Sequence, residues 1–234
     1  MAPLQFDETT EVIAAMNAQG RIPAYWQEAT QTLSARDPIM ANLIEVHRPF
    51  LLGTRGDAFQ TLARAIVGQQ ISVRAAQSVW QRFVACVGTM APTDVLRAPI
   101  EALRGAGLSA RKAEYVCDLA RHFETRAIDI AAWPALEDEA IIEQLVEVRG
   151  IGRWTAEIYL IFHLGRPNVL PLLDLGLQRG LSLNYNRGKP LSPTKLKRIT
   201  AAWAPWRSVG TWYMWRSLEP VVGTAAGEGA ESSG

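Results

Sequence analysis

Apolar residues recur every three to four positions along almost the whole chain, which is the spacing that gathers them on one face of an α-helix. The alternating pattern of strands and the dipeptides of tight β-hairpins are missing. The pattern therefore predicts an all-α protein. The predicted helices span residues 7–18, 23–34, 37–46, 57–67, 72–87, 92–105, 109–126, 136–147, 152–164, 174–181, 192–202 and 205–218.

Helix starts are marked by side chains that can accept hydrogen bonds from the first free N–H groups of a helix. Ser72, Thr93 and Ser109 stand where such N-caps are expected, and Pro205 suits the first turn of the last helix. The chain after Val222 is small, polar and rich in glycine. We therefore predict a disordered tail over residues 221–234.

The composition is that of a globular protein, with 48% hydrophobic and 20% charged residues among 234. No apolar run approaches the roughly 18 to 20 residues of a membrane span. The N-terminus lacks a basic segment followed by an apolar one, which is the pattern of a secretory signal. We expect an intracellular protein, in the cytoplasm and nucleoid or, in a eukaryote, in the nucleus, and no membrane partner.

The two cysteines, Cys86 and Cys117, lie far apart in apolar helical contexts, without CxxC spacing and without nearby histidines. Neither zinc nor an iron-sulfur cluster would find enough ligands in this sequence. Both cysteines are therefore expected to be structural thiols.

Positive charge is concentrated in the C-terminal third, although the formal net charge is only +1. Residues 1–144 contain 13 Lys and Arg against 17 Asp and Glu, whereas residues 145–220 contain 11 against 4. A polyanionic partner meeting the second segment would explain this asymmetry, and a solvated basic face would have the same composition.

A short glycine turn interrupts the helical pattern in LVEVRGIGRWTAEIYL, residues 145–160. Gly150 and Gly152 can adopt positive φ and leave no Cβ in the way of a ligand. The second helix would begin at this turn, so that its free N–H groups and the positive end of its dipole form a phosphate site beside Arg149 and Arg153. Ile151 can pack inward. The alternative is an ordinary αα-hairpin with glycine at the helix C-cap.

An acidic residue stands among leucines in VLPLLDLGLQRG, residues 169–180. An ionised carboxylate at Asp174 is costly to bury unless other groups compensate its charge or use it. Asp174 can also be the N-cap of the helix that begins at Leu175, and the two roles are compatible.

The sequence LVEVRGIGRWTA resembles the helix-hairpin-helix element of DNA repair glycosylases, and DLGL is similar to their alkylpurine branch. The resemblance spans residues 37–218 and implies two helical domains with the active-site cleft between them. Residues 58–166 would form a central domain that ends in the hairpin, and residues 1–57 with 167–220 a discontinuous domain that carries Asp174. Asp174 would be the catalytic carboxylate, which stabilises the cationic sugar and orients or deprotonates the attacking water.

The residue after Arg153 indicates the reaction type. Members that also cut the DNA backbone have a lysine there, whereas GIGRWTA with Trp154 matches the branch called 3-methyladenine DNA glycosylase II. The resemblance therefore implies hydrolysis without a lyase step. The indole of Trp154 suits a positively charged alkylated base. The same resemblance places Trp215 in the base pocket together with Ile158 and Tyr159, where the best-known bacterial member has a tyrosine at the position of Ile158.

A flipped base leaves a gap that a protein side chain must fill. Gln69 and Gln70, in the break GQQIS between two helices, are the candidates, and Gln70 falls at the family's intercalating position. The alternative is that both are ordinary polar loop residues before the cap Ser72. Lys112 and its neighbour Arg111, at a helix start, are further candidates for phosphate contact. The remaining residues expected to contact DNA are Arg149, Gly150, Ile151, Gly152, Arg153 and Thr155.

The sequence as a whole thus predicts a monomeric, monofunctional DNA glycosylase of base excision repair, acting on double-stranded DNA that contains alkylated purines such as 3-methyladenine. A monovalent cation at the hairpin carbonyls is the one cofactor that the resemblance suggests. The alternatives are a non-catalytic helix-hairpin-helix DNA-binding protein, which Asp174 disfavours, and a bifunctional glycosylase/lyase, which Trp154 disfavours. Whether 7-methylguanine, hypoxanthine or ethenoadenine are further substrates is left open by the sequence.

Overall fold

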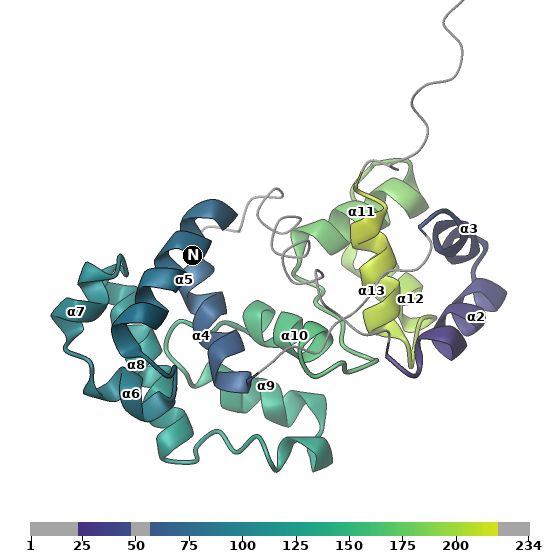
Figure 1. Ribbon diagram of the computed structural model, residues 1–234. Coiled ribbons are helices and arrows are strands. Elements are labelled where there is room, and N and C mark those ends of the chain that lie inside the picture. The colour runs from purple at the N-terminus through teal and green to yellow at the C-terminus, as the bar shows by residue number, and fades with distance from the viewer. Residues whose placement is uncertain (1–22, 48–56, 220–234) are drawn as a thin grey trace, which may run out of the picture.

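The computed structural model describes residues 23–47 and 57–219, and within these ranges every regular element is helical (Figure 1). The predicted all-α class is confirmed. The helix predicted at residues 7–18 and the tail predicted at 221–234 lie outside the described ranges. In chain order the elements are α2 (Trp26–Arg36), α3 (Pro38–Val46), α4 (Ala58–Gly68), α5 (Val73–Val87), α6 (Pro92–Arg97), α7 (Ile100–Gly105), α8 (Ala110–Glu124), the 3-10 helix η1 (Trp133–Ala135), α9 (Asp138–Val146), α10 (Arg153–Phe162), α11 (Leu175–Asn186), α12 (Pro193–Ala201) and α13 (Arg207–Arg216).

Two of the predicted helix starts are confirmed by their hydrogen bonds. The hydroxyl of Ser72 accepts from the backbone N–H of Ala75 at the start of α5, and that of Ser109 caps α8 in the same way. Thr93 is not a cap, because α6 begins one residue earlier at Pro92, whose fixed φ and missing N–H suit the first helical position. Pro205 was placed wrongly as well, since α13 begins only at Arg207.

Two helices differ in extent from the prediction. The helix expected over residues 92–105 is divided into α6 and α7, because the residue before Pro99 is forced out of helical geometry and Ala98 has φ −69° and ψ 130°. α11 continues beyond Leu181 to Asn186, and it ends where Arg187 adopts a left-handed φ of 54°. The short helix η1 was not predicted.

The helices gather in two groups (Figure 1). Helices α4 to α8 pack together at one end of the molecule, with α8 in contact with both α4 and α6. At the other end α13 packs against α11 and also against the N-terminal helices α2 and α3. The ends of the described chain are joined there: the hydroxyl of Tyr185 donates to Asp37 Oδ2 at 2.5 Å, and Arg36 donates to the carbonyl of Ala204 at 2.8 Å. The domain boundaries at residues 57 and 166 stay predictions.

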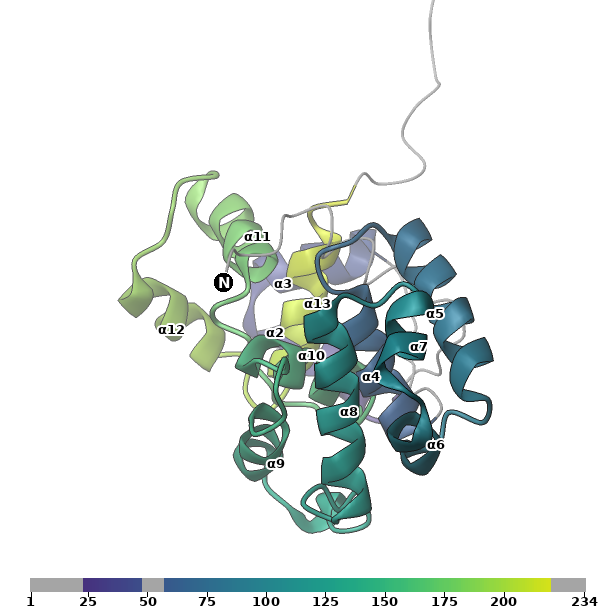
Figure 2. The same cartoon turned by 90° about the vertical axis from the view of Figure 1, so that its left-hand side faces the viewer.

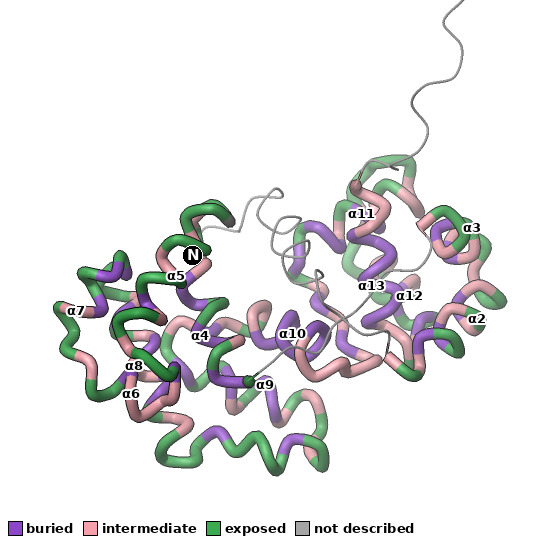
Figure 3. Tube along the Cα trace, in the orientation of Figure 1, coloured by how far each residue is buried: buried purple, intermediate pink, exposed green. Residues whose placement is uncertain are grey.

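The most deeply buried helices are α10 and α13 (Figure 3). In α13 every residue from Ser208 to Trp215 is buried. Glycines allow α11 to approach α13 closely, because a Cβ on Gly180 would lie 2.5 Å from the carbonyl oxygen of Met214. The linker between α10 and α11 is fixed to α13 through Ser208, whose hydroxyl accepts from Val169 N–H at 3.0 Å and donates to Arg166 O at 2.6 Å. The start of α11 is therefore held beside both α10 and α13.

None of the helices in the described ranges is both long enough and apolar enough to cross a membrane.

Candidate active site

The carboxylate of Asp174 lies where α10, α11 and α13 meet. Asp174 is only 3% exposed. Oδ1 accepts hydrogen bonds from the backbone N–H of Leu177 at 2.6 Å and from the indole Nε1 of Trp215 at 2.7 Å. Oδ2 accepts from the indole Nε1 of Trp154 at 2.7 Å. Three donors from three helices thus hold one carboxylate.

This arrangement explains how a negative charge is tolerated among leucines. Burial of an unpaired carboxylate is costly, whereas hydrogen bonds to an ionised group are short and strong. Asp174 is also the N-cap of α11, as the sequence indicated, so its charge lies at the positive end of that helix. The loop before it is fixed as well, since Gln178 donates from Nε2 to the carbonyl of Leu172 at 2.7 Å. The oxygens are therefore preorganised in one orientation.

The two tryptophans predicted for the base pocket are both at Asp174. Trp215 is 3% exposed and stacks on Phe162, with ring centroids 5.7 Å apart and an interplanar angle of 13°. Trp154 is only partly buried. Their N–H edges face the carboxylate, which the sequence analysis did not foresee. Gly176 makes room for this contact, because a Cβ there would lie 3.1 Å from both Asp174 Oδ1 and Trp215 Cδ1. This glycine is the third residue of the motif DLGL, which resembled the alkylpurine branch of the family.

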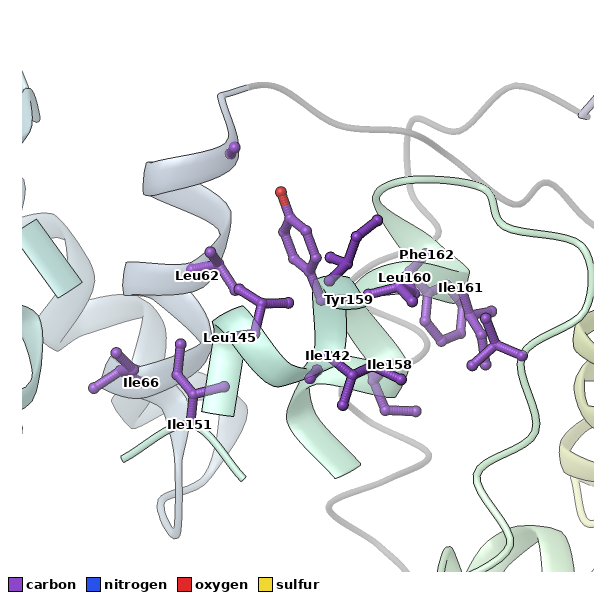
Figure 4. Packing of buried hydrophobic residues seen from close by; sticks show 14 of the residues in the cluster. Leu62, Ile66, Ile142, Leu145, Ile151, Ile158, Tyr159, Leu160, Ile161 and Phe162 are labelled. Carbon is purple, nitrogen blue, oxygen red and sulfur yellow. The ribbon is translucent and has the colours of Figure 1, made fainter. Parts of the chain in front are cut away.

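The other two predicted pocket residues, Ile158 and Tyr159, point to different sides of α10. Ile158 lies one turn beyond Trp154 on α10 and is buried. Tyr159 points to a different side of that helix (Figure 4) and stacks on His163 at 4.6 Å, with its other neighbour Trp133 edge-on at 5.8 Å. Burial raises the pKa of the Tyr159 hydroxyl far above its usual value, and the negative charge of Asp57 adds to this effect. The structure therefore does not bring Tyr159 to Asp174.

The turn between α9 and α10 uses its two glycines differently. Gly150 has φ +90°, as expected for a glycine-only position, whereas Gly152 has φ −92° and ψ 166°, which any residue can adopt. A Cβ on Gly150 would lie 2.2 Å from Cδ2 of Tyr115 in α8, so the protein itself requires this glycine. Ile151 packs inward beside Ile66 of α4, as expected (Figure 4).

The first N–H groups of α10 form the candidate phosphate site. Gly152 is the N-cap and has no side chain to accept a hydrogen bond from them. The amides of Arg153, Trp154 and Thr155 therefore present donors at the positive end of the helix dipole. This geometry suits a phosphate oxygen approaching the turn.

The arginines flanking the turn are already engaged by carboxylates. Arg149 Nη2 lies 2.9 Å from Glu114 Oε2. Arg153 binds Glu139 through two hydrogen bonds of 2.6 and 2.7 Å, and its Nε lies 3.0 Å from Glu157. Each arginine thus has a carboxylate partner beside the turn, and its contact with a phosphate stays a prediction.

A second buried carboxylate lies near the site. Glu157 is 6% exposed and follows Trp154 by three residues on α10. Burial raises the pKa of Glu157, and the charges of Glu139 and Asp174 act in the same direction, while Arg153 opposes the shift. Glu157 was not among the predicted site residues, although a glutamate inside an apolar helix was a visible signal.

The candidate wedge residues also differ from one another. Gln69 donates from Nε2 to the carbonyl of Gly150 at 2.9 Å, so its side chain fixes the turn. Gln70 is exposed and has a left-handed φ of 59°. Lys112 donates to the carbonyls of Val67 and Gln69 at 2.7 and 2.6 Å, and its burial lowers its pKa. Gln70 therefore protrudes, and Lys112 supports the loop instead of being available for a phosphate.

The sequence and the fold are both similar to those of known DNA repair proteins. The family model described as "HhH-GPD superfamily base excision DNA repair protein" matches residues 63–207. The Bacillus subtilis protein YfjP is 29% identical over 188 residues, which are 77% of this chain and 66% of that protein, slightly under two thirds.

Two solved structures are similar over 81% of this chain. A DNA-3-methyladenine glycosidase from Bacillus halodurans is 36% identical, with a TM-score of 0.76 and 88% of its own chain covered. The 3-methyladenine DNA glycosylase Mag1 of Schizosaccharomyces pombe, solved in complex with abasic DNA, is 28% identical, with a TM-score of 0.69 and 96% covered.

Proposed function

The chain belongs to the HhH-GPD superfamily of base excision DNA repair proteins, and from this premise we propose that it is a monofunctional DNA glycosylase. It hydrolyses the N-glycosidic bond of alkylated purines such as 3-methyladenine in double-stranded DNA and leaves an abasic site. The observation that carries the proposal is the carboxylate of Asp174, held by Trp154, Trp215 and Leu177.

Asp174 supplies the negative charge that the reaction needs. As the bond from the sugar to the base breaks, positive charge develops on the deoxyribose ring. A buried carboxylate stabilises that charge more strongly than one in water does. Its oxygens also orient a water molecule and accept a proton from it as the water attacks the sugar. Alkylated bases such as 3-methyladenine carry positive charge and leave readily, so no protein acid is required at the leaving base.

Trp154 limits the reaction to hydrolysis. Its indole has no amine that could attack the sugar and form a Schiff base. The exposed part of its ring suits contact with a cationic base, and the N–H edge simultaneously holds Asp174.

The protein acts as a monomer on duplex DNA in the compartment that holds the genome.

The hairpin and the protruding loop serve DNA binding. The amides at the start of α10 grip a backbone phosphate without reading sequence. Gln70 enters the gap that the flipped nucleotide leaves, since its amide can hydrogen-bond the unpaired base opposite.

The carbonyl oxygens of Val148 and Gly150 at the hairpin would hold a monovalent cation, which would supply positive charge for a DNA phosphate. The carbonyls of Val148 and Gly150 each accept one hydrogen bond, from Ile151 N–H and from Gln69 Nε2 respectively. A carbonyl oxygen has two lone pairs, so each retains capacity for a cation. DNA affinity should therefore be higher in potassium chloride than in tetramethylammonium chloride at equal ionic strength.

The proposed function is tested with duplex DNA methylated by an alkylating agent. Wild-type protein is expected to release 3-methyladenine, detected by chromatography, without strand breaks. Asp174→Asn should retain DNA binding and lose most of the release. Binding without release by the wild type would indicate a non-catalytic DNA-binding protein, and a borohydride-trapped adduct with strand cleavage would indicate a lyase.

A further inference from the structure

A second group of cations lies away from the turn, on the loop that follows α11 and on α12. The α11–α12 basic surface consists of Arg187, Lys189, Lys195, Lys197 and Arg198. All except Lys195 are exposed. The sequence contains no Asp or Glu between Asp174 and Glu219. The local charge of this surface is therefore uniformly positive.

The arginines at the turn and after α10 differ from the cations of the basic surface in their partners. Arg149, Arg153 and Arg166 pair with Glu114, Glu139 and Asp138. Among the residues that the structure describes, the exposed members of the basic surface form no ion pair. The excess positive charge of residues 145–220 thus resides chiefly on the loop after α11 and on α12.

The connection between these helices is held by its own hydrogen bonds. Asn186 donates from Nδ2 to the carbonyls of Lys189 and Pro190 at 2.9 and 3.0 Å, and its Oδ1 accepts from Lys195 Nζ at 3.0 Å. Ser192 caps α12. Such a loop loses little conformational freedom on binding, so its charges are presented in a fixed arrangement.

Helix α11 sets the separation between Asp174 and the near end of this surface, at Arg187. It begins directly after Asp174 and ends at Asn186, which is 12 residues. A helix of that length spans about 18 Å at 1.5 Å per residue. Successive phosphates of one DNA strand are about 3.4 Å apart along the axis, so along a duplex that runs parallel to α11 this separation corresponds to roughly five base pairs. Figure 2 shows α11, α12 and their connecting loop at the edge of the molecule opposite α5.

We propose that the α11–α12 basic surface binds the phosphate backbone of the duplex about five base pairs from the flipped nucleotide. The identity of the partner rests on the proposed function. The lysines and arginines contribute a contact that is independent of sequence, because they neutralise phosphates and release counterions. The surface extends the DNA footprint to one side of the active site and leaves the chemistry at Asp174 unchanged.

The test neutralises three of the four exposed residues, whose side chains take no part in the hydrogen bonds of the loop, in the variant Lys189→Gln, Lys197→Gln, Arg198→Gln. The matched control is Arg97→Gln, Arg104→Gln, Arg121→Gln, which removes the same charge from exposed positions on α6, α7 and α8. The probe is a 25-base-pair duplex with a stable abasic analogue, titrated at several salt concentrations. Each lost phosphate contact lowers the slope of log Kd against log salt by about 0.9.

We expect the basic-surface variant to bind at least tenfold more weakly at low salt, with a slope smaller by two to three, and the control variant to bind like the wild type. The loss should appear only in duplexes whose long arm extends to one side of the abasic analogue. Equal affinity and slope for both variants would overturn the proposal and would leave this surface to an acidic protein. Base release at saturating enzyme is measured in parallel, and its absence in the wild type would refute the glycosylase activity instead.

Discussion

At the scale of single residues, two tryptophan side chains act on the carboxylate of Asp174 through their N–H edges. We predict that Trp154→Phe lowers the rate of base release about 10- to 100-fold, because a hydrogen bond to a charged group contributes about 1.5–3 kcal/mol and each 1.4 kcal/mol is a factor of ten. The measurement is the single-turnover rate on methylated DNA. Phenylalanine retains the aromatic face, so an unchanged rate would mean that the N–H group does not matter.

The control for this substitution is Trp206→Phe. Trp206 stacks on Tyr25 at 5.7 Å and belongs to a different part of the aromatic cluster. Its loss of N–H should leave the rate within about twofold of the wild type. A comparable fall in both variants would point to general destabilisation.

The two glycines of the turn make a second comparison between single residues. Gly150→Ala should lower the free energy of unfolding by at least about 2 kcal/mol, because alanine is strained at φ +90° and its Cβ would collide with Tyr115. Gly152→Ala should cost much less, since φ −92° is open to any residue. Urea unfolding of both variants is the measurement. Equal losses would contradict the assigned roles.

Gly152→Ala also tests whether a phosphate binds at the start of α10. If phosphate approaches the first amides of α10 closely, the added methyl group should weaken DNA binding in a protein that is still folded. Affinity for an abasic duplex, measured alongside unfolding, separates the two effects.

At the scale of elements, α10 carries three residues with different roles in its first five positions. Arg153 lies at the turn, Trp154 donates to the carboxylate of Asp174, and Glu157 is a buried acid. The pKa of Glu157 is raised by burial, so the folded state holds its proton at higher pH than the unfolded state does. The stability of the wild type should therefore fall as pH rises from the ordinary glutamate value of about 4.5 through the raised pKa.

This pH dependence is tested with Glu157→Gln. The stability of the variant relative to the wild type should increase between pH 4.5 and pH 7.5, because glutamine has no proton to lose. Glu143→Gln on the exposed side of α9 is the control. A relative stability that is independent of pH, or one that decreases, would contradict the raised pKa.

Local sequence patterns predicted the helices well and their partners poorly. The periodicity located α4, α5, α8 and α10 to within a few residues, because amphipathic helices repeat every 3.6 residues. The break before Pro99 was readable from the proline itself. By contrast, the contact of Tyr115 with Gly150 and that of Arg149 with Glu114 join residues 35 apart. No local pattern encodes such contacts, so the prediction left the turn more open and more positive than it is.

The same distinction applies to the candidate site. A motif was enough to single out Asp174, Trp154 and Trp215, which the structure brings together. Ile158 and Tyr159 are adjacent in sequence, and their directions depend on which face of α10 meets which neighbour. That information came only with the packing of Tyr159 against Trp133 and His163.

At the scale of the whole molecule, the N-terminal helices α2 and α3 are tied to the C-terminal helices. The hydroxyl of Tyr185 donates to Asp37, which also caps α3. Tyr185→Phe should lower the free energy of unfolding by about 1.5–3 kcal/mol, because Asp37 would lose a hydrogen bond to its charge in a half-buried place. The measurement is urea unfolding followed by circular dichroism.

Tyr25→Phe is the matched control for this contact. The buried hydroxyl of Tyr25 has no hydrogen-bond partner among the described residues, so its removal should cost little. If both substitutions had the same effect, the hydrogen bond between Tyr185 and Asp37 would not be what joins α3 to α11.

The position of Asp174 bears on how this protein can evolve. Groups that perform chemistry are commonly unfavourable for folding, so natural selection for activity and selection for stability oppose each other. Here the candidate catalytic carboxylate accepts hydrogen bonds from α10, α11 and α13 and joins them. A mutation to a residue without an acceptor oxygen would forfeit activity and helix packing together. A descendant with an apolar residue at this position would therefore need compensating substitutions at Trp154 and Trp215.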